Sequence, residues 1–160
     1  MLVDEHGRQV RIGVYGLAIG DQGNPAILLT RLAADEVDAD FWTLPGGGLD
    51  WGEHPLDGLK REFIEETGLE PRLLMPLGIH SYSLDSEQRR RPGPSIHVIQ
   101  AVYLVAAAGT PVHEVGGSTV EARWFPLTEL GPVPVVELVN VALALKDALT
   151  LGSEPPPPIG

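Results

Sequence analysis

The chain has 160 residues, of which 43% are hydrophobic, and its 22 acidic and 11 basic side chains give a net charge of −11. We expect one globular domain with a sizeable core. The charge excludes non-specific binding to nucleic acid or to an anionic membrane, and the lack of cysteine excludes disulfides, thiol chemistry and cysteine zinc sites. The start is acidic, and the longest apolar stretch, 102–108, is too short for a membrane span. We therefore expect a cytoplasmic protein with no membrane partner.

The first part of the chain predicts a β-hairpin. Residues 10–19 and 26–31 are apolar and rich in β-forming side chains, and the stretch 21–25 between them is a dense turn signal. Residues 33–40 are small and acidic, which is typical of an exposed loop. A short strand is predicted at 41–44, directly before a run of three glycines.

A helix is predicted over residues 55–67. Pro55 stands in the first turn, where a backbone N–H would lack a helical partner, and Gly68 supplies a common helix end. At about 100° per residue, the helix separates an apolar side from an acidic side. The apolar side consists of Leu56, Leu59 and Phe63. The acidic side consists of Glu62, Glu65 and Glu66.

The three glutamates on one helix face predict a metal site. Like charges three and four residues apart repel by a few tenths of a kcal/mol per pair, and no lysine stands where it would neutralise them. A hard divalent cation offsets this repulsion because it binds carboxylate oxygens. The glycines before the helix let the backbone approach a bound group, so the carbonyl of Gly46 is a further candidate ligand. The alternative is a solvated acidic face with a structural role only.

The glycine loop and the helix resemble the signature of the Nudix hydrolases, G-x5-E-x7-R-E-U-x-E-E-x-G-U, in which U is a bulky apolar residue. The matching residues are Gly47, Glu53, Arg61, Glu62, Phe63, Glu65, Glu66, Gly68 and Leu69. Phe63 replaces the usual aliphatic residue, and we interpret it as repacking on the core side of the helix. The segments 42–47 and 124–127 also resemble the family.

This resemblance implies an α/β fold, a Nudix-type α/β/α sandwich with a mixed β-sheet between helices, as a single domain over 1–152. It implies metal-dependent hydrolysis of a diphosphate linkage in a nucleoside diphosphate linked to another moiety. It implies Mg²⁺ or Mn²⁺ as the cofactor, with metal ligands among Glu62, Glu65, Glu66 and the carbonyl of Gly46. The catalytic residues that it implies are Glu53, Arg61, Glu65 and Glu66. Arg61 would orient a glutamate, for which we expect Glu53, and the general base is left open among Glu53, Glu65, Glu114 and Glu121.

The second part of the chain predicts strands at 72–83, 96–106 and 119–125 and a helix at 134–149. Three arginines, Arg89–Arg91, lie in the connection between the first two of these strands and form the only concentrated positive charge in the sequence. They belong either to a solvated loop or to a clamp on substrate phosphates, which guanidinium groups match in geometry. The proline-rich residues 153–160 are expected to be a disordered end.

We expect a nucleotide-type small-molecule substrate, no nucleic-acid partner and, from the resemblance, a homodimer as one option. One alternative function is a non-catalytic nucleotide-binding or regulatory module with the same fold. Such proteins usually lose glutamates of the signature, and all are present here. The other alternative, a purely structural acidic helix, leaves the glycine loop and Arg61 without a role.

Overall fold

The computed structural model describes residues 2–21, 23–36, 38–112 and 116–151. Two helices and eight strands are found in these ranges, with two short 3₁₀ helices at Ser86–Gln88 and Leu127–Glu129. The elements are, in chain order, β1 (Leu2–Val3), β2 (Gln9–Asp21), β3 (Pro25–Leu32), β4 (Trp42–Thr43), β5 (Gly46–Gly48), α1 (Pro55–Thr67), β6 (Arg72–Leu84), β7 (Ile96–Ala106), β8 (Thr119–Pro126) and α2 (Glu137–Leu151). Neither helix, within these ranges, combines the length and the apolar character that crossing a membrane requires.

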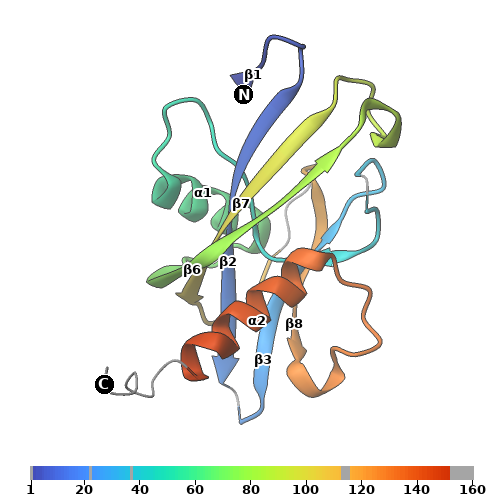
Figure 1. The fold of residues 1–160 in the computed structure, drawn as a ribbon. Helices are drawn as coiled ribbons and strands as arrows, with labels where there is room; N and C mark the ends of the chain where they lie inside the picture. Colours follow the sequence, from blue (N-terminus) through green and yellow to red (C-terminus); the bar gives the residue numbers. More distant parts are fainter. Residues whose placement is uncertain (1, 22, 37, 113–115, 152–160) are drawn as a thin grey trace, which may run out of the picture.

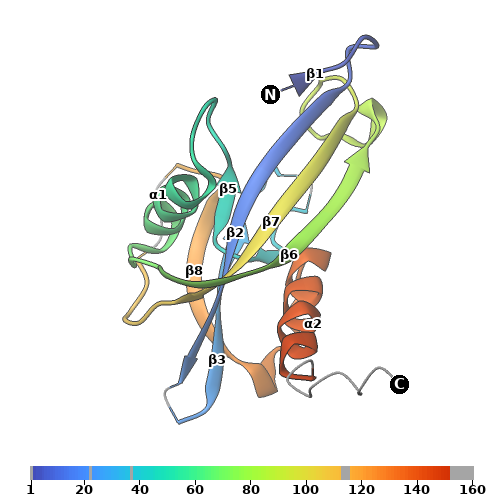
Figure 2. The same ribbon diagram turned by 60° about the vertical axis from the view of Figure 1, so that its left-hand side comes forward.

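The strands form one mixed sheet. Its main path runs β4-β3-β2-β7-β6, with β1 and β5 also paired to β2 and β8 paired to β3. The central pair β2 and β7 is parallel, whereas the neighbouring pairs β2–β3 and β6–β7 are antiparallel. The helices α1 and α2 cover opposite faces of this sheet (Figures 1 and 2). The predicted α/β/α sandwich with a mixed sheet is confirmed.

The core lies on both faces of the sheet because successive strand residues point to opposite sides. On β3, Ile27 and Leu29 belong to the cluster under α2, whereas Leu28 belongs to the cluster under α1. All three side chains are fully buried. The helices complete these clusters with apolar side chains: Leu138, Val139 and Ala142 from α2, and Leu59 and Phe63 from α1.

Phe63 is fully buried, and a glycine of β2 makes room for its ring. A Cβ atom added to Gly16 would stand 3.1 Å from two carbons of the Phe63 ring and 3.2 Å from a methyl group of Val105. The absence of a side chain at Gly16 therefore accommodates an aromatic residue in place of an aliphatic one. The predicted position of Phe63 on the core side of the helix is confirmed.

The predicted hairpin and the predicted strand at 96–106 are confirmed, and strand 72–83 extends by one residue to Leu84. The glycine run, expected as a loop, instead forms β5, in which Gly46 pairs with Tyr15 of β2. Glycine carries no side-chain pattern and is depleted in strands, so the sequence gives no sign of this pairing.

The predicted start of the second helix at Pro134 is wrong by three residues. The N–H of Trp42 donates to the Pro134 carbonyl, and the N–H of Val136 donates to the Trp42 carbonyl, both at 2.9 Å. Residues 134–136 are therefore held extended against β4, and α2 begins at Glu137. The predicted tail, 153–160, lies outside the described residues.

Candidate active site

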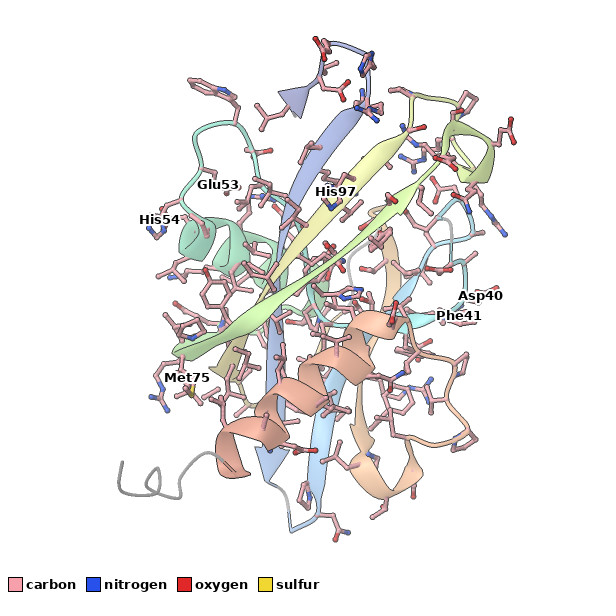
Figure 3. All side chains as sticks on the ribbon, in the orientation of Figure 1. Asp40, Phe41, Glu53, His54, Met75 and His97 are labelled. Atoms are coloured by element: carbon pink, nitrogen blue, oxygen red, sulfur yellow. The ribbon has the colours of Figure 1, made fainter. Side chains whose placement is uncertain are left out.

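Helix α1 begins and ends where the sequence predicts. His54 is the N-cap, and its Nδ1 accepts a hydrogen bond from the N–H of Leu56 at 3.2 Å. Pro55 occupies the first turn, and Gly68 adopts the left-handed conformation, with φ of 70°, that ends the helix. Glu53 and His54 lie at the start of α1 (Figure 3). The two caps therefore fix which residues are helical, and with them the directions in which the polar side chains of α1 point.

The last glutamate of the helix is fixed to the glycine strand. Glu66 is only 2% exposed, and its Oε2 accepts a hydrogen bond of 3.0 Å from the N–H of Gly46. Gly46 has φ of 150°, and a Cβ added there would collide with the carbonyl oxygen of Val14. Only glycine can occupy this position without moving β2, and the pairing of β5 with β2 thus places a backbone amide at the Glu66 carboxylate.

The next glycine makes room for a second carboxylate. A Cβ added to Gly47 would stand 2.6 Å from the Cδ and Oε2 atoms of Glu62. The carboxyl group of Glu62 therefore lies against the bare Cα of Gly47. Together β5 and α1 bring Gly46, Gly47, Glu62 and Glu66 to one place.

Arg61 connects the loop, the strand and the helix through four hydrogen bonds. Its Nε and Nη2 donate to the two carboxylate oxygens of Glu53, at 2.8 and 2.9 Å. Its Nη1 donates to Glu62 at 2.6 Å, and its Nη2 also donates to the carbonyl of Gly48 at 3.2 Å. This fork geometry is the one that arginine forms with carboxylates. The predicted contact between Arg61 and Glu53 is confirmed.

These contacts shift the titration of both partners. The hydrogen bonds from Arg61, with a further one from the N–H of Asp50, lower the pKa of Glu53 from its ordinary value of 4.5 to about 2. Hydrogen bonding to Glu53 and Glu62 raises the pKa of Arg61. Glu53 and Arg61 are therefore both charged at neutral pH.

The remaining candidates for the general base have different surroundings. Glu65 is about half exposed, at 47%, and its carboxylate is 3.7 Å from Arg61. Glu121 on β8 pairs with Arg31 and Arg123, at 3.2 and 2.9 Å. Glu114 lies outside the described residues. The structure thus brings Glu53 and Glu65 to Arg61 and engages Glu121 with two other arginines.

The predicted ligands have the right chemistry for a hard cation. Carboxylates and a backbone carbonyl are the oxygen donors that Mg²⁺ and Mn²⁺ take, and the bare Cα of Gly47 makes room for the carboxyl group of Glu62. In the part of the chain that the structure describes, no three carboxylates or histidines already converge as a metal-binding cluster. Here Glu62 is hydrogen-bonded to Arg61 and Glu66 to Gly46. The ligand set therefore stays a prediction.

A cavity of about 830 Å³ adjoins these residues on the α2 side of the sheet. Its volume suits a ligand of nucleotide size. Side chains of β2, β6 and β7 form its floor: Arg11, Tyr15, His80, Tyr82, Val98 and Gln100. Gly46, Gly47 and Glu66 line it, and so do residues of two loops: Asp35, Glu36, Asp38 and Arg89–Arg91. The cavity therefore connects the signature residues with the arginine-rich loop.

Sequence reasoning missed most of the cavity floor. His80, Tyr82 and Leu84 all line the cavity, and their spacing of two along β6 is the signal that could have placed them on one face. Tyr15 was also missed, and burial raises the pKa of its hydroxyl group. The strands β2 and β6 both contribute to the cavity floor although β7 lies between them in the sheet. The sequence carries no signal for this arrangement, because it depends on the order of the strands.

The fold and this site define a class of protein. The family model of the NUDIX domain matches residues 8–143, and the chain belongs to this family. The chain is similar to an RNA pyrophosphohydrolase of Psychrobacter sp. (strain PRwf-1), at 45% identity over 34% of this chain and 35% of the relative. It is also similar to the ADP-ribose pyrophosphatase of Methanocaldococcus jannaschii, at 35% identity over 56% of this chain and 48% of the relative. The chain thus spans between a third and a half of the length of these curated relatives.

Solved structures agree with the family assignment. A MutT NUDIX hydrolase from Burkholderia pseudomallei superimposes with a TM-score of 0.68 and 28% identity, over 86% of this chain and 98% of that chain. A MutT protein from Methanosarcina mazei Go1 superimposes with a TM-score of 0.69 over 92% of this chain, at 21% identity, which supports the fold alone. The resemblance noted in the sequence is confirmed.

Proposed function

We propose that this protein is a metal-dependent pyrophosphohydrolase that cleaves a diphosphate linkage in a nucleoside diphosphate attached to another moiety. One observation carries the proposal: Glu66, fixed to the strand Gly46–Gly48, borders both the acidic face of α1 and a cavity of about 830 Å³. The names of the curated relatives support the reaction class.

In this proposal, the ligands of Mg²⁺ or Mn²⁺ come from among Glu62, Glu65, Glu66 and the Gly46 carbonyl. When bound, the cation supplies positive charge to phosphate oxygens and increases the acidity of water. The chain itself contributes the geometry. Gly46 orients Glu66 through its N–H, and Arg61 orients Glu62 and connects it to Glu53.

The hydrogen bonds of Glu53 favour a positioning role over a role as general base. Both of its oxygens accept hydrogen bonds from Arg61, and its pKa of about 2 makes it a weak base at neutral pH. Glu65 is about half exposed, and its closest described cation is 3.7 Å away. Of these two candidates, Glu65 is the better general base.

The proposed substrate is a small nucleotide, and the proposed location is the cytoplasm. The net charge of −11 disfavours extended nucleic acid. RNA carrying a 5′-triphosphate nevertheless belongs in the test, because several relatives are named for RNA.

The test is phosphate or pyrophosphate release from nucleoside triphosphates, nucleotide sugars, dinucleotides and 5′-triphosphorylated RNA, with Mg²⁺ or Mn²⁺ and with a chelator. The Glu66→Gln variant is the matched control, because it keeps the shape of the side chain and removes its charge. We expect metal-dependent release from one substrate class and at least about a 100-fold loss of turnover in Glu66→Gln with unchanged circular dichroism. Release that persists with chelator, or a fully active variant, would contradict the proposal. Nucleotide binding without any turnover would favour a binding module.

A further inference from the structure

The arginines of this acidic protein fall into two groups. Within the described residues, five of the nine form salt bridges with carboxylates: Arg8, Arg31, Arg61, Arg91 and Arg123. The other four are Arg11, Arg72, Arg89 and Arg90. Of these four, Arg11, Arg89 and Arg90 line the same cavity as Glu66. Carboxylates outnumber basic groups two to one in this chain, so unpaired guanidinium groups concentrated in one cavity point to an anionic ligand.

Arg89 and Arg90 retain most of their hydrogen-bond donors. The Nη1 of Arg89 donates to the carbonyl of Pro94 and the Nη1 of Arg90 donates to the carbonyl of Ala34, both at 2.6 Å. A guanidinium group has five N–H donors, and these are the only hydrogen bonds that the described residues provide to either group. Each side chain is therefore fixed at one point and keeps donors for a ligand.

Carboxylates also line this part of the cavity. Asp35 forms an ion pair with Arg91, and the carboxylate of Glu36 lies 3.7 Å from the same guanidinium group. Asp38 lines the cavity without a salt bridge in the described part of the chain. Arg91 offsets one of the two charges of Asp35 and Glu36, so two carboxylate charges remain once Asp38 is included, and the three arginines Arg11, Arg89 and Arg90 exceed them by one.

The arginine loop lies far from the signature residues along the sheet. Gly46 pairs with Tyr15, which pairs with Val102 of β7. Leu84, the last residue before the arginine loop, pairs with Ile96 of β7. Ile96 and Val102 are six residues apart, which is about 20 Å along a strand at roughly 3.3 Å per residue. One phosphate group therefore cannot contact both Gly46 and the arginine loop.

We propose that Arg89 and Arg90, with Arg11 between them and the signature residues, form a second anion subsite for a phosphate group of the substrate that is not cleaved. The orientation of the substrate rests on the proposed function, in which the diphosphate lies at Glu66. The preferred substrate class is then a nucleotide with an additional phosphate beyond its 5′ chain, as a monoester on the ribose or as a diester to a further nucleoside. Guanidinium groups suit such a phosphate because they bind two of its oxygens at once.

The test measures binding of three compounds that contain no diphosphate linkage: AMP, adenosine 3′,5′-bisphosphate and the dinucleotide pApA. Calorimetry in the presence of Mg²⁺ compares the wild type with the double variant Arg89→Gln/Arg90→Gln. The matched control is Arg72→Gln, which removes an exposed arginine that lies outside the cavity and has no carboxylate partner in the described residues. We expect the wild type and Arg72→Gln to bind at least one of the two larger compounds about tenfold or more tightly than AMP, and the double variant to lose this preference.

Equal binding of all three compounds by the wild type would overturn the proposal, and so would a preference that survives in the double variant. Because these compounds cannot be hydrolysed at a diphosphate, the result does not depend on turnover. Failure of the proposed function would instead be seen as absent phosphate release from every nucleoside triphosphate and diphosphate substrate. The two failures are therefore distinguishable.

Discussion

The same residue type has different surroundings on the two faces of the sheet. Arg61, on α1, makes four hydrogen bonds to Glu53, Glu62 and Gly48. Arg89 and Arg90, at the cavity on the α2 side, make one hydrogen bond each within the described part of the chain, to a backbone carbonyl. Arg61 uses four of its five N–H donors, which fixes the site in place, whereas unused donors are available to a ligand. The charges beside α1 are thus structural parts of the site, and those of the cavity loop are suited to selecting a substrate.

Of the substitutions that test this comparison, Gly47→Ala is expected to have the largest effect, and the effect is on turnover. The new Cβ would stand 2.6 Å from the Glu62 carboxyl group, so this carboxylate must move by an ångström or more. Misplacement of this size costs about 100-fold in rate, and we expect that loss in turnover with an intact fold. Gly131→Ala is the control, since nothing lies within 4 Å of the added atom there. Normal turnover in Gly47→Ala would show that the rate of the reaction does not depend on the position of the Glu62 carboxylate.

Arg61→Lys tests whether the network beside α1 stabilises the fold. An ammonium group cannot reproduce the fork of hydrogen bonds to Glu53 and also reach Glu62 and Gly48. We expect the free energy of unfolding in urea to fall by about 2 kcal/mol. Arg72→Lys makes the same chemical change on the exposed start of β6. An equal effect of the two substitutions would remove the distinction between the two groups of arginines.

The substitution Glu53→Gln tests the contact between Arg61 and Glu53 through the pH dependence of the unfolding free energy. The pKa of Glu53 is depressed in the folded protein from 4.5 to about 2, so its contribution to stability is fully present above pH 4.5 and is lost as the pH falls towards 2. The difference in unfolding free energy between wild type and variant should therefore shrink across this range. Glu129→Gln, at an exposed position, controls for the change in net charge. A difference that is constant with pH would contradict the assigned interaction.

The smallest effect is expected from Arg91→Gln. Arg91 and Asp35 are 64% and 60% exposed, and exposed ion pairs contribute little because water and salt screen them. We expect the free energy of unfolding to change far less than in Arg61→Lys, and the effect to decrease at high salt. A loss as large as that of Arg61→Lys would show that the contact between the two cavity loops supports the fold.

The sequence predicts those parts of this protein that local patterns determine. Helix α1 has a proline and a glycine at its ends, and β7 alternates buried and more exposed side chains over most of its length. The start of α2 was missed because the Trp42 backbone holds residues 134–136 extended, which is a contact between distant segments. The Arg61–Glu53 contact could be predicted from the family signature. The convergence of Arg11 and Arg89 on one cavity could not, because it depends on the pairing of β6, β7 and β2.

The parallel pairing of β2 with β7 also has a consequence for the order of folding. Gln9 pairs with Ile96, so these strands meet only after a loop of more than half the chain has closed. The β2–β3 hairpin and the contact between Gly46 and Glu66 close much shorter loops. Long loop closures delay folding, so we expect the face of the sheet that packs on α1 to form early and the floor of the cavity to form last. Newly synthesised chains would then complete the contact between the glycine strand and α1 before they complete the floor of the cavity.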